Sequence, residues 1–350
     1  MDFRTIIARA VDRRASDVHL TVGLPPVFRI DGKLVNAGTM PLTESDVYEA
    51  VRLITTEKEL KELNTVGEVD LAVSFEGSRM RVNAYKQQGC TAMALRLLPL
   101  NIPSAEELGL PPVIVAQADK PRGLVLVTGP TGSGKSSTLA ALLDHINTNE
   151  RRHIITLENP IEYVHTRKQS VINQREIGHD TESFAAGLRA ALRQDPDVIL
   201  VGEMRDLETI STAITAAETG HLVFGTLHTK GAADTVDRII DVFPAAQQPQ
   251  IRAQLAEVLE CVVSQILLPK KSGGRRAIFE VMVVNSAIRN LIRQSKTFQI
   301  VSTMQTNKRA GMQLMDDALA DAVRVGDISL EDALAAANDP TVVKTAAMRR

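Results

Sequence analysis

The stretch Gly129-Pro130-Thr131-Gly132-Ser133-Gly134-Lys135-Ser136 constrains the fold more than any other part of this sequence. It matches the pattern G-x-x-x-x-G-K-[ST] of a phosphate-binding loop at every fixed position. The apolar run at residues 124–127 before it is typical of a buried parallel strand. Leucine and isoleucine then recur at helical spacing over residues 139–146, so a helix is predicted to begin near Lys135.

A strand, a glycine-rich turn and a helix N-terminus present backbone N–H groups to a polyphosphate, and the helix dipole favours the anion. Lys135 is expected to reach the β- and γ-phosphates, and the Ser136 hydroxyl to ligate Mg²⁺. A chance glycine-rich turn is the alternative, but strand, motif and helix all agree with the first interpretation. The residues predicted to bind the nucleotide are Gly129, Thr131, Gly132, Ser133, Gly134, Lys135, Ser136 and Ser137.

Length and composition set the broad class. A chain of 350 residues is expected to hold about two domains, each with its own core. Its 44% hydrophobic and 23% charged residues are typical of a soluble globular protein. The 40 basic residues are balanced by 42 acidic ones, and the aromatic residues are 3 Tyr and 8 Phe with no Trp. Neither a basic surface nor a base-stacking platform for nucleic acid is therefore expected.

Cysteine usage and hydropathy point to a compartment. Cys90 and Cys261 form no C-x-x-C pair, so the sequence favours a reducing environment over a disulfide framework or a zinc site. No apolar run approaches the roughly 18 residues of a membrane span, and the N-terminus lacks a signal-peptide pattern. The sequence predicts a cytoplasmic protein.

Residues 1–98 are predicted to form a small α+β domain. A capping-box pattern at Thr43–Asp46 predicts one helix that continues to about Leu63, and Asp31-Gly32 predicts a hairpin turn. Prolines recur over residues 99–121, which indicates a linker with one short helix. The expected strands of the domain are 17–22, 27–30, 33–35, 69–75, 79–85 and 91–97.

Residues 122–350 show an α/β pattern. Strands are predicted at 153–158, 197–203 and 222–227, with helices between them, and this alternation indicates a parallel sheet. Beyond Pro244 the chain is expected to be mostly helical, with an apolar helical stripe over residues 251–266 buried in the core.

Two carboxylate sites follow predicted strands, where open parallel sheets place their ligands. Glu203 ends the apolar run 198–202, which is the arrangement of a Walker B acid. Glu158 and Glu162 follow the strand at 153–158. Hydrolysis of a phosphoanhydride requires a positioned water and a group that orients it. From the residues alone, Glu162 fits this role no better than it fits an ordinary surface position.

His221 and His228 stand on either side of the strand predicted at 222–227. Their separation is unsuited to a paired zinc site. A hydrogen-bonded structural histidine and a γ-phosphate sensor both remain open for them.

Motifs along nearly the whole chain resemble those of the secretion-superfamily hexameric ATPases, and within them the twitching-motility retraction ATPases of type IV pili. Besides the phosphate loop, the matching segments are 16–20, 29–32, 156–165, 173–176, 190–193, 195–197, 202–209, 216–221 and 225–229. The sequence departs from the family pattern at Asn159, where the family usually has Asp.

This resemblance implies a PAS-like N-terminal domain, a RecA-like motor domain and six chains in a ring that hydrolyses ATP with Mg²⁺. It implies that Glu162 polarises water, that Glu203 holds Mg²⁺ through water, and that His228 senses phosphate. It also implies that Arg81 and Arg96 reach the nucleotide from the N-terminal domain.

The segment Ala287-Ile288-Arg289-Asn290-Leu291-Ile292-Arg293-Gln294 resembles the motif associated with retraction, although Gln294 replaces the usual glutamate. The implied partners are an inner-membrane platform protein of a type IV pilus machine and a paralogous retraction ATPase, with no nucleic acid. They would place the protein at the cytoplasmic face of the inner membrane. The alternatives are a pilus assembly or type II secretion ATPase, a hydrolysis-poor accessory subunit of another motor, and a ring that translocates nucleic acid.

Overall fold

The computed structural model describes residues 2–30, 32–98 and 101–348, which fall into two compact units. One unit contains the chain up to Asn101 together with Pro160–Val164. The other contains Ile102–Asn159 and the chain from His165 onwards. Asp31, half of the predicted hairpin turn, lies outside the described residues, whereas Gly32 has φ +80°.

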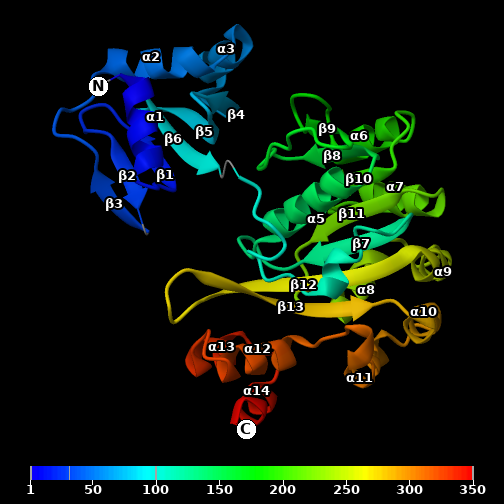
Figure 1. Cartoon of the computed structure of the whole chain (residues 1–350). Coiled ribbons are helices and arrows are strands. Elements are labelled where there is room, and N and C mark those ends of the chain that lie inside the picture. Colours follow the sequence, from blue (N-terminus) through cyan, green and yellow to red (C-terminus); the bar gives the residue numbers. More distant parts are fainter. Residues whose placement is uncertain (1, 31, 99–100, 349–350) are drawn as a thin grey trace. The chain divides into compact units, whose positions relative to one another are not determined.

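The described part of the first unit folds into a six-stranded antiparallel sheet with helices packed against it (Figure 1). The strand order is β3-β2-β1-β6-β5-β4. The predicted α+β pattern is confirmed, and the core is formed by the sheet together with α1, α2 and α3, with Phe3 and Ile7 of α1 buried in it. The elements are α1 (Phe3–Asp12), β1 (Asp17–Leu20), β2 (Val27–Ile30), β3 (Lys33–Asn36), α2 (Glu44–Ile54), α3 (Glu57–Val66), β4 (Glu68–Phe75), β5 (Ser78–Gln87) and β6 (Cys90–Leu98).

The single helix predicted from Thr43 to Leu63 is wrong, because the structure has two helices there. Thr55 is extended, with φ −108° and ψ 148°, and ends α2. Thr56 then begins α3 with a capping box, as Thr43 does for α2. Each threonine accepts a hydrogen bond from the third residue of its helix, which satisfies an N–H group that the helix leaves unpaired.

The described part of the second unit folds around a seven-stranded sheet in the order β13-β12-β7-β11-β10-β8-β9. All neighbours are parallel except β12 and β13, which form an antiparallel hairpin at one edge. The predicted parallel sheet is confirmed. Its elements are α4 (Pro112–Val115), β7 (Gly123–Thr128), α5 (Lys135–Asn149), β8 (His153–Glu158), β9 (Val171–Glu176), α6 (Phe184–Ala191), β10 (Val198–Val201), α7 (Leu207–Glu218), β11 (Leu222–Leu227), α8 (Ala232–Asp241), α9 (Gln248–Val258), β12 (Leu259–Pro269) and β13 (Arg275–Val283).

The apolar stripe over residues 251–266 is buried as predicted, but only its first half is helical. Helix α9 ends at Val258, and Leu259 begins the buried strand β12. Periodicity alone does not separate a buried strand from a buried helix, and the β-branched pair Val262-Val263 favours the strand. Strands β9 and β13 were likewise absent from the prediction.

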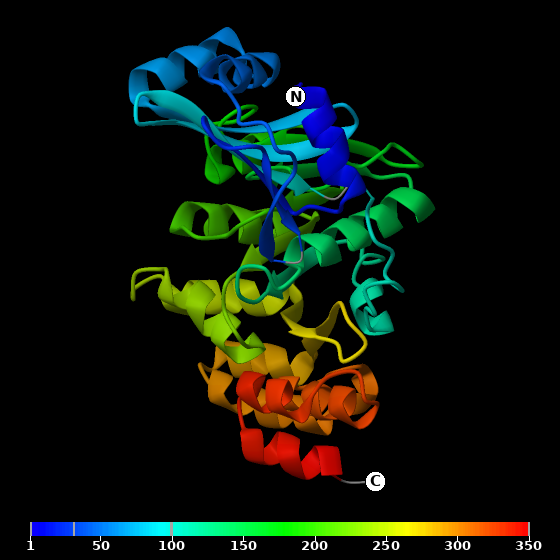
Figure 2. The ribbon, with the colours of Figure 1, turned by 90° about the vertical axis from the view of Figure 1, so that its left-hand side faces the viewer.

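The C-terminal helices pack beside β13 (Figures 1 and 2). The buried carboxylate of Glu280 on β13 accepts hydrogen bonds from the backbone N–H of Ala232 (2.8 Å) and of Met315 (3.3 Å). It thereby joins the first residues of α8 and α12, while burial raises its pKa. No helix among the described residues is long and apolar enough to cross a membrane. The remaining helices are α10 (Ser286–Arg293), α11 (Ile300–Thr306), α12 (Met315–Arg324), α13 (Leu330–Ala336) and α14 (Pro340–Met348).

Candidate active site

Most of the predicted site residues lie at the carboxyl ends of the parallel strands of the second sheet. Thr128 at the end of β7 pairs with Leu227 at the end of β11. Val201 at the end of β10 pairs with both Gly225 and Leu157. Because the strands are parallel, their carboxyl ends meet at this edge. The phosphate loop, His228, Glu203 and Glu158 each lie at or just beyond one of these strand ends.

The phosphate loop is held in a conformation that depends on glycine. Gly129 has φ +138°, and a Cβ atom there would lie 2.2 Å from the carbonyl oxygen of Gln265. Gly134, at φ +91°, is the residue that precedes α5. Both backbones are in a region that other residues rarely adopt. The tight turn therefore brings the loop directly to the N-terminus of α5.

The loop fits a bound polyphosphate. The Lys135 ammonium donates to the carbonyl oxygens of Gly129 (2.8 Å) and Pro130 (3.1 Å), so it already lies across the loop. Ser133 Oγ is buried and has no hydrogen-bond partner among the described residues. Within the same residues no side chain caps α5, and its first turn contains no acidic residue. The positive end of the helix dipole therefore meets no acidic side chain from its own first turn, which favours an anion there.

Glu203 and His228 follow different strands and are in direct contact. His228 Nε2 lies 2.6 Å from Glu203 Oε1, and Arg205 pairs with the same carboxylate. Arg205 was not singled out from the sequence. His221 has a different role, because its Nδ1 lies 2.9 Å from the Ala216 carbonyl oxygen at the end of α7. Of the two histidines, His228 is the one at the site.

Glu158 is held at the end of β8 by hydrogen bonds from Thr156 Oγ1 (2.6 Å) and Gln174 Nε2 (3.1 Å). Glu162 lies on the irregular segment that follows β8 and is half-buried. It belongs to residues 160–164, which group with the first unit.

Arg81 and Arg96 lie opposite one another on β5 and β6 of the first unit. They line a cavity of about 210 Å³ together with Asp17 and His19. The Nε atom of Arg96 lies 3.0 Å from Asp17 Oδ1, while 69% of the arginine side chain is exposed. Burial alone would raise the pKa of Asp17, but hydrogen bonds from Ser16 and Arg96 hold it below its ordinary value. Asp17 thus holds the Nε side of the Arg96 guanidinium, while most of the side chain is exposed.

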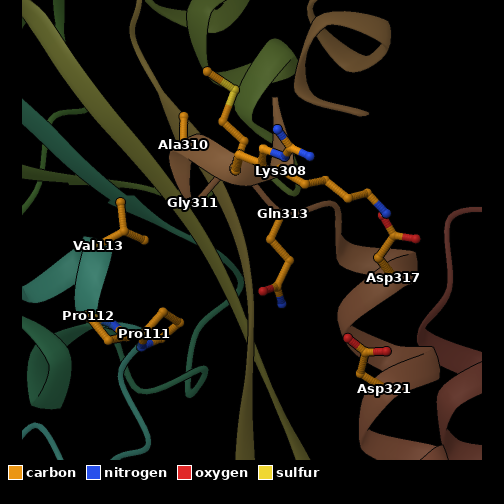
Figure 3. A pocket seen from close by; sticks show the side chains of 11 residues that line it. Pro111, Pro112, Val113, Lys308, Ala310, Gly311, Gln313, Asp317 and Asp321 are labelled. Carbon is orange, nitrogen blue, oxygen red and sulfur yellow. The ribbon is translucent and has the colours of Figure 1, made fainter. Parts of the chain in front are cut away.

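The second unit has a cavity of about 550 Å³ between α4 and the segment before α12 (Figure 3). No phosphate-loop residue lines it. Lys308 points toward Asp317 and pairs with it at 2.7 Å (Figure 3). Gly311 has φ +85° where a Cβ atom would lie 2.8 Å from Val113, so glycine lets these segments approach.

His165, at the end of the motif 156–165, supplies a test of stability. Burial lowers its pKa to about 4, against an ordinary value of 6.5. Below pH 6.5 His165 is protonated in the unfolded chain but stays neutral in the folded chain. The free energy of unfolding therefore falls as the pH drops below 6.5. Between pH 7 and pH 5 the loss is expected to be about 2 kcal/mol. The free energy of unfolding of His165→Leu should fall less than that of the wild type between pH 7 and pH 5, as measured by thermal unfolding. An equal fall in both proteins would contradict the prediction.

The comparisons with known proteins agree with this geometry. The model of the Type II/IV secretion system protein family matches residues 2–335. The chain belongs to this family. It is 48% identical over 341 residues to the type IV pilus retraction ATPase PilT of Pseudomonas aeruginosa, covering 97% of this chain and 99% of PilT. It is 49% identical over 310 residues to a twitching motility protein of Neisseria gonorrhoeae, covering 88% and 83% of the two chains.

A solved structure extends the likeness to the fold. The crystal structure of the pilus retraction motor PilT with bound ADP matches with a TM-score of 0.93 at 48% identity, and 99% of each chain is covered. The expected fold class, an N-terminal domain and a RecA-like motor domain, is confirmed. With its complete phosphate loop, the chain is a nucleotide-binding ATPase of this family.

Proposed function

We propose that this protein is the motor that retracts type IV pili in twitching motility, driven by hydrolysis of Mg²⁺-ATP. The observation that carries the proposal is the complete phosphate loop on the same sheet edge as the Glu203–His228 pair. The proposal is also supported by the 48% identity of this chain, over nearly its full length, to a retraction ATPase.

The residues divide the chemistry among them in this proposal. The backbone N–H groups of Thr131–Ser137 and the Lys135 ammonium bind the phosphates. Ser136 and Glu203 hold Mg²⁺, the latter through water, since this ion prefers oxygen ligands and retains several waters. His228, hydrogen-bonded to Glu203, responds to the γ-phosphate. Glu162 orients the attacking water.

Arg81 and Arg96 supply positive charge to the nucleotide from the N-terminal domain. We assign residues 1–98 to this domain, 99–121 to a linker and 122–350 to the motor domain with its helical C-terminal region. Six chains form a ring, and the working partners are a membrane platform protein of the pilus machine and a paralogous motor. The protein then works in the cytoplasm at the inner face of the membrane and takes no nucleic acid.

Arg293 offers the sharper test of retraction, because the structure gives Arg289 a structural role. The Arg289 guanidinium donates to the carbonyl oxygens of Ala256 (2.6 Å) and Glu257 at the end of α9, and it pairs with Glu260 at 2.7 Å. Arg293 is half-exposed and lies 3.4 Å from Glu257. Replacing Arg289 therefore removes these hydrogen bonds from a charged donor, two of which are partly buried, and this costs about 1–3 kcal/mol.

Arg293→Ala is expected to keep the thermal stability and the ring of the wild-type protein, to abolish twitching and to leave cells with excess surface pili. Arg289→Ala should show the same phenotype with a lower melting temperature. Twitching assays, counts of surface pili and thermal unfolding measure these effects. Loss of pili in the Arg293 variant or in a deletion strain would assign the motor to assembly instead.

A further inference from the structure

Gln265 is a buried polar residue in the largely apolar strand β12. Only 2% of its surface is exposed, and its neighbours along one face of β12, Cys261 and Val263, belong to the hydrophobic cluster under α5. A side-chain amide in such surroundings is costly unless both of its ends are hydrogen-bonded. Both ends of Gln265 find their partners in the phosphate loop and the helix that follows it.

The amide bridges two parts of the nucleotide site. Its Nε2 atom donates to the carbonyl oxygen of Ser133 at 2.8 Å, within the loop. Its Oε1 atom accepts from Thr138 Oγ1 at 2.8 Å, in the first turns of α5. One side chain thus ties the loop to the start of the helix, on either side of Lys135 and Ser136.

The backbone of β12 adds a steric constraint at the same place. Ser264 Oγ lies 2.9 Å from Thr128 Oγ1, where the pairing between β12 and β7 ends. Gln265 therefore lies beside the first loop residue, and its carbonyl oxygen leaves no room for a side chain at Gly129. A Cβ atom at Gly134 would lie 2.8 Å from Gln265 Nε2. Gln265 therefore contacts both ends of the loop so closely that only glycine fits at Gly129 and Gly134.

We propose that Gln265 is a positioning residue that holds the phosphate loop in its nucleotide-binding conformation. The inference rests on the proposed role of this loop. With the Ser133 carbonyl bound to Gln265, the loop presents its N–H groups to the phosphates. Without that bond the loop samples other conformations, and apparent affinity falls by the fraction of molecules that remain competent.

The test is a titration of the full-length protein with ADP and Mg²⁺, alongside thermal unfolding without nucleotide. Gln265→Ala should weaken ADP binding about 10- to 30-fold, because it removes two buried hydrogen bonds that shape the loop. Gln265→Glu, of nearly the same size, should weaken it at least as much, since a carboxylate cannot donate to the Ser133 carbonyl. Relative to the wild type, the fold-decrease in the kcat of Gln265→Ala should be smaller than the fold-increase in its KM for ATP.

Variants at the other end of the bridge separate positioning from general packing. Thr138→Val should weaken ADP binding by a smaller factor, and Thr138→Ser, which keeps the hydroxyl, should restore it. Gln313→Ala is the matched control, because Gln313 also donates to a strand carbonyl, that of Phe279 at 3.2 Å, but does not contact the loop. It should bind ADP as the wild type does.

Wild-type affinity in Gln265→Glu, or an affinity loss in Gln313→Ala equal to that in Gln265→Ala, would overturn the inference and leave the proposed function intact. A wild-type protein that binds no ADP would overturn both. These outcomes are distinguished within one series of titrations.

Discussion

Glu162→Gln is expected to lower ATP turnover about 100-fold or more while nucleotide affinity stays close to that of the wild type. Glutamine has nearly the same size as glutamate but cannot accept a proton from the attacking water, and loss of such a group typically costs at least about 10²-fold. Because Glu162 lies on the irregular segment after β8 and outside the phosphate loop, the change should spare binding. Steady-state turnover and an ADP titration measure the two quantities separately.

The control is Glu331→Gln, an exposed glutamate on α13 that should hydrolyse ATP at the normal rate. Normal turnover in Glu162→Gln would reject the assignment and pass the role to Glu158. That carboxylate already lies at the end of β8, held by Thr156 and Gln174. Glu158→Gln would then have to show the large loss.

Gly129→Ala is expected to reduce ADP affinity on the order of 100-fold, equivalent to about 3 kcal/mol. Two costs act together at this position. The backbone has φ +138°, and the added methyl group would lie 2.2 Å from the carbonyl oxygen of Gln265, which as backbone of β12 cannot rotate away. The loop must therefore shift, and the N–H groups that bind phosphate shift with it.

Two other glycines separate these costs. Gly132 has φ +79° with no atom within 4 Å of a Cβ position, so Gly132→Ala should show backbone strain without the clash and a smaller loss of affinity. Gly220 has φ +108° and similar free space outside the loop, so Gly220→Ala should bind ADP normally. Equal affinities in the variants of Gly129 and Gly220 would show that close packing on Gln265 does not shape the loop.

Much of the motor could be predicted from the sequence because the signals are local. A run of apolar residues, a glycine-rich turn and a helical repeat identify β7, the phosphate loop and α5 without reference to distant residues. The same holds for Glu203 at the end of an apolar run. Where two local signals overlapped, the prediction failed: the capping box at Thr56 was merged into the preceding helix.

Long-range contacts account for what the sequence left open. The stripe over residues 251–266 has the hydrophobicity of a buried helix, and only pairing of β12 with β7 and β13 makes its second half a strand. Once β12 lies there, Gln265 meets a loop more than 120 residues earlier in the chain. The contact of His228 with Glu203 likewise arises from the parallel alignment of β10 and β11. Chain propensities act over a few residues, whereas the partners of a buried polar group are chosen by the packing of the whole sheet.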